Sequence, residues 1–355
     1  MRKGLIYLAL IASLLVSCEE YYTPEIEETA GLLVVESRLT NDPAQNFVKL
    51  SMTRDFYSSE ASEKLSGAQV DLVEIGGLIS RAVESNAGYY TFQKIPVSGK
   101  TYQLRIAYQK ESYLSDLVVM PPLPHIDTLY TKHKIETIFR TDAYGNPELV
   151  ESAGREICID APITAKLEYY RFRWQTVLLW TYHPPSIGDA PPPPPLYGWK
   201  SRFDGGLYNL AGPKEFSTSG FVRRHPVLSL SYNTKAYLDS TEQSPNGWII
   251  IVNQYGITQK SHEFHEKLNR QFAAEGSLFD PVLTQVYGNI HCKSDASKIV
   301  LGFFDMTSYR QYRYYLNLGS GPDNQVIQRR LNRYPEIPED GYEIGTRPYF
   351  WENNY

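Results

Sequence analysis

Apolar and polar residues alternate with a period of two along short runs that begin after Gly31. A strand places successive side chains on opposite faces of a sheet, so these runs indicate strands with one buried face and one solvated face. Turn residues such as Gly76-Gly77 separate the runs at intervals of roughly ten residues, which is typical of an immunoglobulin-like β-sandwich. The runs that predict these strands are residues 32–37, 47–51, 68–74, 88–92, 101–108 and 113–120.

A proline-rich segment, residues 121–124, ends this first region. Proline has no N–H to donate to a strand ladder, so we place a domain boundary there and predict an immunoglobulin-like β-sandwich domain over residues 31–124. Residues 125–355 are then a larger β-rich C-terminal domain with one helix, and the fold class is mainly β. The runs that predict its strands are residues 126–139, 156–162, 169–177, 227–232, 247–255, 286–290, 299–304 and 309–317.

Three features of the second region are more specific. In the run Tyr169–Val177, aromatic residues alternate with basic or polar ones, so one face is expected in the core and the other in water. A helix is predicted over residues 258–275, where Phe264, Leu268 and Phe272 recur at every fourth position and form an apolar stripe. The runs at 286–290 and 299–304 are expected to pair with each other.

The start of the chain has a different pattern. Arg2 and Lys3 precede a short apolar run, which ends in Leu-Val-Ser-Cys at residues 15–18. This is the layout of a secretory signal peptide, here residues 1–17. Its end resembles the lipobox of bacterial lipoproteins, in which the cysteine is diacylated and becomes the mature N-terminus. Cys18 is therefore the expected lipidation site, and an ordinary cleaved signal with an incidental cysteine is the alternative.

Residues 18–30 are polar and acidic and are expected to form a lipidated N-terminus and a spacer between the membrane and the first domain. Several acyl chains on one cysteine give stable membrane anchoring, which a single chain does not. Glu19 and Glu20 directly follow Cys18 and resemble the acidic surface-export signal of Bacteroidetes lipoproteins. We therefore expect an outer-membrane protein that is lipid-anchored and faces the cell exterior.

Composition narrows the functions further. The net charge is −5, and it becomes more negative when Arg2 and Lys3 leave with the signal peptide, which argues against nucleic acid as a partner. The 28 Tyr, 14 Phe and 5 Trp favour strands, and tyrosine also suits a contact surface. Cys158 and Cys292 lie in predicted strands and are expected as buried free thiols, with a disulfide as the alternative.

No catalytic pattern stands out, and we expect no catalytic residue, cofactor or metal. His262 and His265 are three positions apart, whereas the zinc-protease motif needs four, so an ordinary helix face is expected there. A stiff proline run and an aromatic strand are the candidates for a partner contact, with a bare exposed insertion as the alternative for the prolines. These candidates are Pro191, Pro192, Pro193, Pro194, Pro195, Tyr309, Tyr312 and Tyr314.

Several motifs occur in a fixed order: the lipobox at Cys18, then residues 33–36, 67–70, 88–90, 276–281, 286–290, 301–304 and 347–351. In this order they resemble a Bacteroidetes lipoprotein family, the domain of unknown function 4249 (DUF4249), over nearly the whole mature chain. The resemblance implies a non-enzymatic binding or accessory subunit beside a TonB-dependent receptor, and it carries no catalytic residue across. The alternatives are a structural or adhesive cell-surface lipoprotein and a hydrolase of extracellular polymers.

The lipid anchor gives the first prediction. The Cys18→Ala protein will move from the membrane to the soluble periplasmic fraction, because no acyl chain then holds it at the bilayer. Detergent-phase partition followed by immunoblotting measures this. A Cys292→Ala protein, which keeps the lipobox, is the matched control and stays in the detergent phase. If Cys18→Ala also stayed there, Cys18 would not be the anchor.

Overall fold

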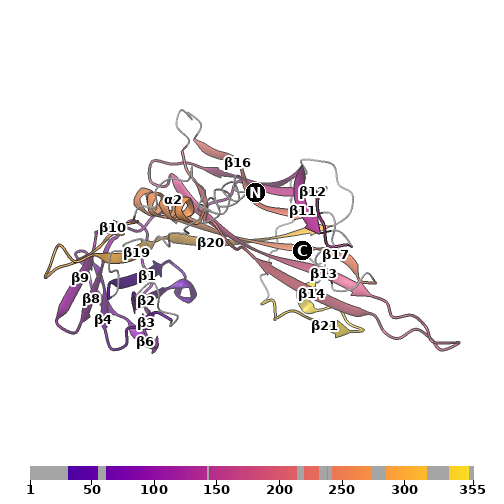
Figure 1. Ribbon diagram of the computed structural model, residues 1–355, viewed down its shortest axis with the longest axis horizontal. Helices are drawn as coiled ribbons and strands as arrows, with labels where there is room; N and C mark the ends of the chain where they lie inside the picture. The colour runs from indigo at the N-terminus through magenta and orange to yellow at the C-terminus, as the bar shows by residue number, and fades with distance from the viewer. Residues whose placement is uncertain are drawn as a thin grey trace, which may run out of the picture.

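The computed structural model describes residues 31–54, 61–141, 144–213, 220–231, 238, 242–273, 285–317 and 336–351. Cys18, Glu19 and Glu20 lie outside these residues. Within them the protein is mainly β, with a single α-helix, as the sequence predicts. A compact group of short strands lies beside a larger sheet whose strands extend well beyond it (Figure 1). No helix in the described ranges is long and apolar enough to cross a membrane.

The strands of the first group are short and separated by tight turns. Their bounds are β1 Leu33–Leu39, β2 Phe47–Met52, β3 Glu63–Lys64, β4 Gln69–Glu74, β5 Ile79–Arg81, β6 Val83–Asn86, β7 Tyr89–Thr91, β8 Thr101–Tyr108, β9 Glu111–Ser115, β10 Val118–Val119, β18 Ile290–Cys292 and β19 Val300–Met306, with a short 3-10 helix, η1, at Pro43–Gln45.

These strands form two six-stranded sheets. One has the order β19-β1-β2-β7-β6 with β3 beside β2, and the other has the order β18-β9-β8-β4-β5 with β10 beside β8. A single apolar core takes Leu33 and Leu50 from the first sheet and Leu104 and Tyr113 from the second. Two sheets that share one core are a β-sandwich. Its immunoglobulin-like character stays a prediction.

Two strands from the second half of the chain complete this sandwich. β18 pairs with β9, and β19 pairs in parallel with β1. The sandwich therefore includes residues 290–306, which the sequence analysis placed in the second domain. The expected pairing of 286–290 with 299–304 is wrong, because residues 293–299 cross from one sheet to the other.

The backbone approaches itself closely beside β19. Gly302 has a φ of +91°, and a Cβ built there would collide with the carbonyl oxygen of Val35 on β1. The Asn289 side chain also binds the backbone of β19. It accepts a hydrogen bond from the backbone N–H of Phe304 at 2.8 Å and donates one to its carbonyl at 3.1 Å. Only glycine, without a side chain, fits this conformation and this space.

The remaining elements form the larger domain. Their bounds are β11 Thr128–Thr141, β12 Pro147–Pro162, β13 Tyr169–Tyr182, β14 Leu196–Phe203, β15 Asn209–Ala211, β16 Phe221–Ser231, β17 Ser244–Ile257, α2 Gln259–Ala273, β20 Ser308–Asn317 and β21 Gly341–Ile344, with a short 3-10 helix, η3, at Tyr349–Trp351. A three-stranded sheet has the order β11-β12-β16. The larger sheet, here called the central sheet, has the order β20-β17-β13-β14-β21 with β15 beside β13.

The central sheet is covered on both faces. One face packs on the three-stranded sheet, with Trp248, Ile250 and Val252 in the shared core. The other face packs on the C-terminal segment, which inserts Phe350 and Trp351 into a second core. A strand with two buried faces has a continuous apolar sequence rather than an alternating one, and β17 has such a sequence.

Both described cysteines are free and buried, as predicted: Cys158 in β12 and Cys292 in β18. Burial, with the neighbouring Glu156 carboxylate as a second cause, raises the pKa of the Cys158 thiol to about 11. A thiol with a raised pKa is a poor nucleophile at neutral pH, so Cys158 acts as a small apolar core residue.

Candidate functional site

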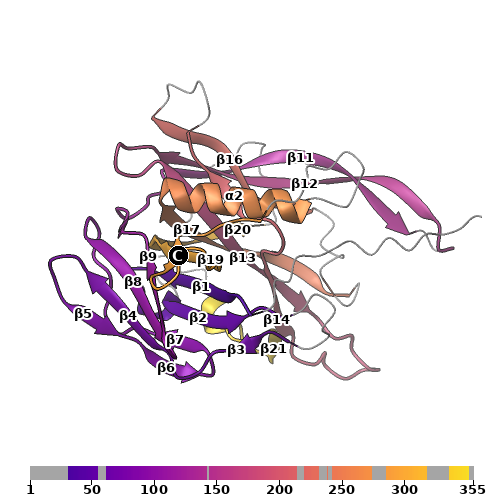
Figure 2. The same cartoon turned by 60° about the vertical axis from the view of Figure 1, so that its left-hand side comes forward.

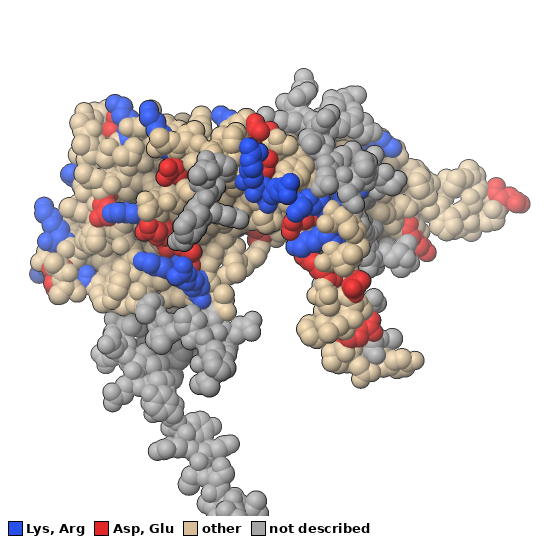
Figure 3. Space-filling model, turned by 90° about the horizontal axis from the view of Figure 1, so that it is seen from above, with Lys and Arg blue, Asp and Glu red and all other residues tan. Residues whose placement is uncertain are grey.

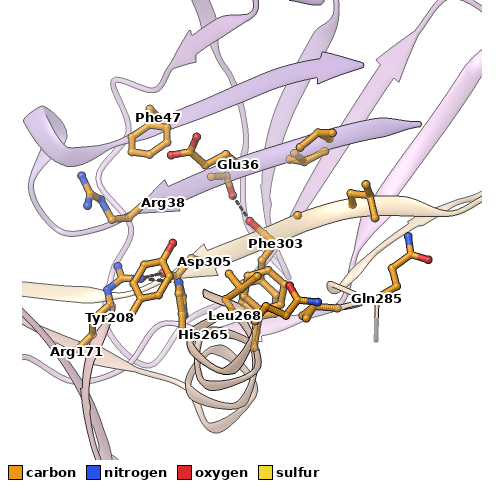
Figure 4. Close-up of a pocket in the computed structure, with 18 of the residues that line it drawn as sticks. Glu36, Arg38, Phe47, Arg171, Tyr208, His265, Leu268, Gln285, Phe303 and Asp305 are labelled. Carbon is orange, nitrogen blue, oxygen red and sulfur yellow. Dashed lines mark hydrogen bonds and ion pairs between the residues drawn. The ribbon is translucent and has the colours of Figure 1, made fainter. Parts of the chain in front are cut away.

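A cavity of about 730 Å³ lies where the sandwich, the central sheet and α2 meet (Figure 4). β1 and β19 of the sandwich form one wall, α2 forms a second, and β13 with the nearby Tyr208 forms a third. The volume lies within the range of sites that bind small molecules. Its walls come from segments far apart in the sequence, so no local motif marks it.

The base of the cavity contains a buried ion pair between two β-strands. The Arg171 guanidinium on β13 lies 3.0 Å from the Asp305 carboxylate on β19, and both side chains are almost fully buried. The Ser261 hydroxyl on α2 donates a hydrogen bond to the same carboxylate at 2.7 Å. Loss of either charge would leave the other buried and uncompensated, which is strongly destabilising.

His265 on α2 joins this network through both ring nitrogens. Nδ1 donates to the Ser261 carbonyl at 2.7 Å, so Nε2 carries the lone pair that accepts from Arg171 Nη1 at 2.9 Å. Burial, and then the positive charge of Arg171, lower the pKa of His265 from 6.5 to about 4. His265 is therefore neutral at pH 7, and it has no free lone pair with which to act as a base.

The inner face of α2 differs from the predicted apolar stripe, although the helix itself lies where it was expected. Its fully buried residues are Ser261 and His265, which are polar. Phe264 stacks on Phe303 of β19, with ring centroids 4.6 Å apart, whereas Phe272 is 64% exposed. The reason is that the strands under the helix present a charged pair, which needs polar partners rather than an apolar stripe.

Cations lie against aromatic rings at this site. The Arg38 guanidinium of β1 lies 5.2 Å from the centroid of Phe47 and 5.4 Å from that of Tyr255. Arg171 lies 5.0 Å from the same Tyr255 ring. Arg38 Nη2 also donates to the Gln45 side chain at 3.0 Å. Such stacking is favourable and fixes the orientation of the planar guanidinium groups.

Tyr208 is fixed by the helix. The Asn269 side chain accepts from the Tyr208 backbone N–H at 2.7 Å and donates to its carbonyl at 2.8 Å. The Tyr208 ring then meets the His265 ring edge to face, with centroids 4.5 Å apart. Arg173, which also lines the cavity, forms a two-point ion pair with Asp204 at 2.9 and 3.1 Å on the exposed side.

The cavity can bind a ligand that has an apolar body and an anionic group. Phe47, Phe264 and Phe303 supply ring surface, and Arg38 supplies positive charge, whereas the charge of Arg173 is compensated by Asp204. Across the described ranges, no group of three or more His, Cys, Asp and Glu side chains is arranged to hold a metal ion.

The residues predicted at a partner contact differ in how far they are exposed to solvent. Pro191–Pro194 are exposed, and Pro195 is half-buried, in the connection between β13 and β14. Tyr309, Tyr312 and Tyr314 on β20 are buried, with at most 8% exposure, so they belong to the core and offer no contact surface. Two strands, β17 and β13, separate β20 from β14, so the structure does not bring the prolines and the tyrosines together.

The sequence analysis missed the central residues of this site. Arg171 lies in the predicted strand 169–177, where the basic residues were expected on the wet face, but α2 and β19 cover it. A signal was present, since Arg171 is flanked by Tyr170 and Phe172, and Asp305 is flanked by Phe304 and Met306. Asp305 is the only charge in its strand, and a single charge within a strongly apolar strand indicates a buried partner of opposite charge.

By fold and site, this is a mainly β protein in which a β-sandwich and a larger β domain line an open cavity of ligand-binding size. The family model described as "Domain of unknown function (DUF4249)" matches residues 19–313, and the chain belongs to this family. The comparison with curated proteins and the comparison with solved structures each gave no match.

The buried histidine makes stability depend on pH. An unfolded histidine binds its proton near pH 6.5, whereas folded His265 does so only near pH 4. Between these values the unfolded state binds more protons, so the free energy of unfolding falls as the pH drops from 6.5 toward 4, by about 3 kcal/mol in all. Denaturant unfolding of wild type and of His265→Gln at several pH values measures this.

The loss should be smaller in His265→Gln, because glutamine does not titrate. His183→Gln is the matched control, since His183 is exposed, and it should keep the wild-type pH dependence. Equal pH dependence in His265→Gln and wild type would show that His265 does not cause the effect.

Proposed function

We propose that this protein is a lipid-anchored outer-membrane protein, displayed on the cell surface, that acts without catalysis as a binding subunit beside a TonB-dependent receptor. The N-terminal pattern that ends at Cys18 and the acidic pair Glu19-Glu20 support the anchor and the display. The accessory role is supported by membership of the DUF4249 family together with the resemblance of the sequence motifs to Bacteroidetes lipoproteins of this kind. In this proposal the immunoglobulin-like sandwich is the domain nearest the membrane.

The cavity is the observation that carries the binding role. Its three walls are tied together at the base by the Arg171–Asp305 ion pair and by the hydrogen bonds of Ser261 and His265. These buried contacts hold the walls in place before any ligand arrives. A preformed site avoids the entropic cost of ordering its own side chains when it binds.

The lining defines the chemical class of the ligand. Ring and aliphatic surface from Phe47, Phe264, Phe303 and Leu268 suits an apolar or aromatic body. Arg38 has one terminal nitrogen, Nη1, outside its two hydrogen bonds to Gln45, and it supplies a donor for an anionic group. The ligand class is therefore an amphipathic anion.

A dye with this chemistry tests the cavity directly. We expect 1-anilinonaphthalene-8-sulfonate, an aromatic sulfonate, to bind the folded protein saturably. Leu268→Trp fills the cavity and Arg38→Gln removes the cation, so each should weaken binding by at least about tenfold. Fluorescence titration at neutral pH measures the dissociation constants.

Lys267→Trp is the control, because Lys267 is the exposed neighbour of Leu268 on the same helix. It should bind the dye as wild type does. Thermal unfolding shows that each variant is folded. Equal affinity in all four proteins would place the dye elsewhere and remove the cavity from the proposal.

The receptor partnership has its own test. A lipid-anchored protein and a receptor share one membrane surface, so their effective concentration is high and a modest affinity suffices. We expect the tagged full-length protein to co-purify with a TonB-dependent receptor from native outer membranes in mild detergent. Replacing Pro191–Pro194 with serine should lower the yield, because a flexible loop loses more entropy on docking than a stiff one.

Recovery of no receptor with wild type would exclude the partnership and favour the structural or adhesive alternative. A receptor recovered equally well with the serine variant would keep the partnership and exclude the proline loop as its contact.

A further inference from the structure

The hairpin of β11 and β12 reaches beyond the sheet that supports it. β11 and β12 pair along their whole length, from Thr128 opposite Asp160 to Thr141 opposite Pro147. Among the described residues, β16 pairs with β12 from Gly154, opposite Ser231, to Pro162, opposite Phe221. Residues 134–153, here called the arm, are the part of the hairpin beyond this pairing. In the described structure they are a ribbon of two strands that projects past the other strands (Figure 2).

One face of the arm is the continuation of the core face. In the body of the protein this face carries Leu129, Thr131, Ile157 and Ile159, all of which are buried. The pairing of β11 with β12 has no register shift, so the same alternation continues outward. On the arm this face exposes Ile135, Phe139 and Leu149 at 58%, 79% and 62%.

An arm of this kind lacks support of its own. A two-stranded ribbon is at best marginally stable in water, and a third strand or a packed face is needed for stability. Within the described part of the chain, β11 pairs only with β12, so its outer side presents an edge of unpaired backbone groups. Exposed edges beside an apolar face are the usual place for another chain to add a strand.

A carboxylate in the middle of this face selects the partner. Glu151 lies opposite Thr137 and between Leu149 and Ala153 along β12. Its side chain is exposed and has no ion-pair partner among the described residues. An apolar cover would bury an unpaired charge, which is costly. A lipid surface offers acyl chains and anionic headgroups, and neither compensates the charge of Glu151.

We propose that the arm docks an extended segment of another protein. This segment adds as a strand at the free edge, covers Ile135, Phe139 and Leu149 with apolar side chains, and places a lysine or arginine against Glu151. Acidic and basic side chains are interspersed on the face of the molecule drawn in Figure 3, so the charge preference of the arm is assigned to Glu151 itself. This docking surface goes beyond the proposed function, and it requires neither the cavity nor a TonB-dependent receptor.

Photo-crosslinking in intact cells tests the arm. The full-length chain carries p-benzoylphenylalanine in place of Phe139 or, as the control, in place of Phe203, which is 66% exposed on β14. We expect a crosslinked species from position 139 that position 203 does not give. Mass spectrometry of the crosslinked peptide should show a segment of another protein in which apolar residues alternate with polar ones and which contains Lys or Arg.

Charge reversal separates the proposal from nonspecific capture. Glu151→Lys should reduce the crosslink from position 139 by at least about tenfold, since like charges then face each other. Glu148→Lys makes the same change on the opposite face of the arm and should leave the yield within about twofold. Thermal unfolding at the wild-type temperature verifies that both variants are folded.

Four results would overturn the proposal: no crosslink above that of position 203, a crosslink to a second copy, a crosslink to lipid alone, or equal effects of the two charge reversals. A mapped partner other than a TonB-dependent receptor would support the arm while removing the receptor partnership, so the two proposals can fail separately.

Discussion

The buried ion pair between Arg171 and Asp305 is the constraint on which the arrangement of this protein depends. One charge lies on the central sheet and the other lies on a sandwich strand, and α2 covers both with Ser261 and His265. Neither charge tolerates burial alone. The sandwich, the sheet and the helix are therefore obliged to meet in one relative position, and the cavity is the space that this position leaves between them.

Hydrophobic periodicity predicted most of the elements because it reports which faces of a strand are buried. The alternating runs of the sandwich, the continuous apolar run of β17 and the helix after it all lie where the sequence places them. Periodicity does not report which strands become neighbours. The sequence analysis therefore left β18 and β19 in the second domain, although they pair with β9 and β1.

The site was harder to predict for a related reason. A charge in an amphipathic strand normally faces water, and that rule placed Arg171 on the wet face. Only the tertiary fold brings Asp305 within reach of it, from more than a hundred residues away. The tyrosines of β20 show the converse error. Their ring surface suits an interface, but Tyr309 packs with Tyr255 and Ile257, and Tyr312 lies in the core that β17 shares with the three-stranded sheet.

The parallel pairing of β1 with β19 also sets the order of assembly. The Ser37 hydroxyl on β1 donates to the Phe303 carbonyl, 266 residues further along the chain. A sandwich that needs both strands cannot close when its first strands emerge during synthesis or export. The sandwich can form only after nearly the whole polypeptide has been made. Contacts between residues so far apart in the sequence give a high contact order, and a high contact order slows folding. During that interval the apolar face of β1 is exposed to water, and the newly synthesised chain must be protected from aggregation.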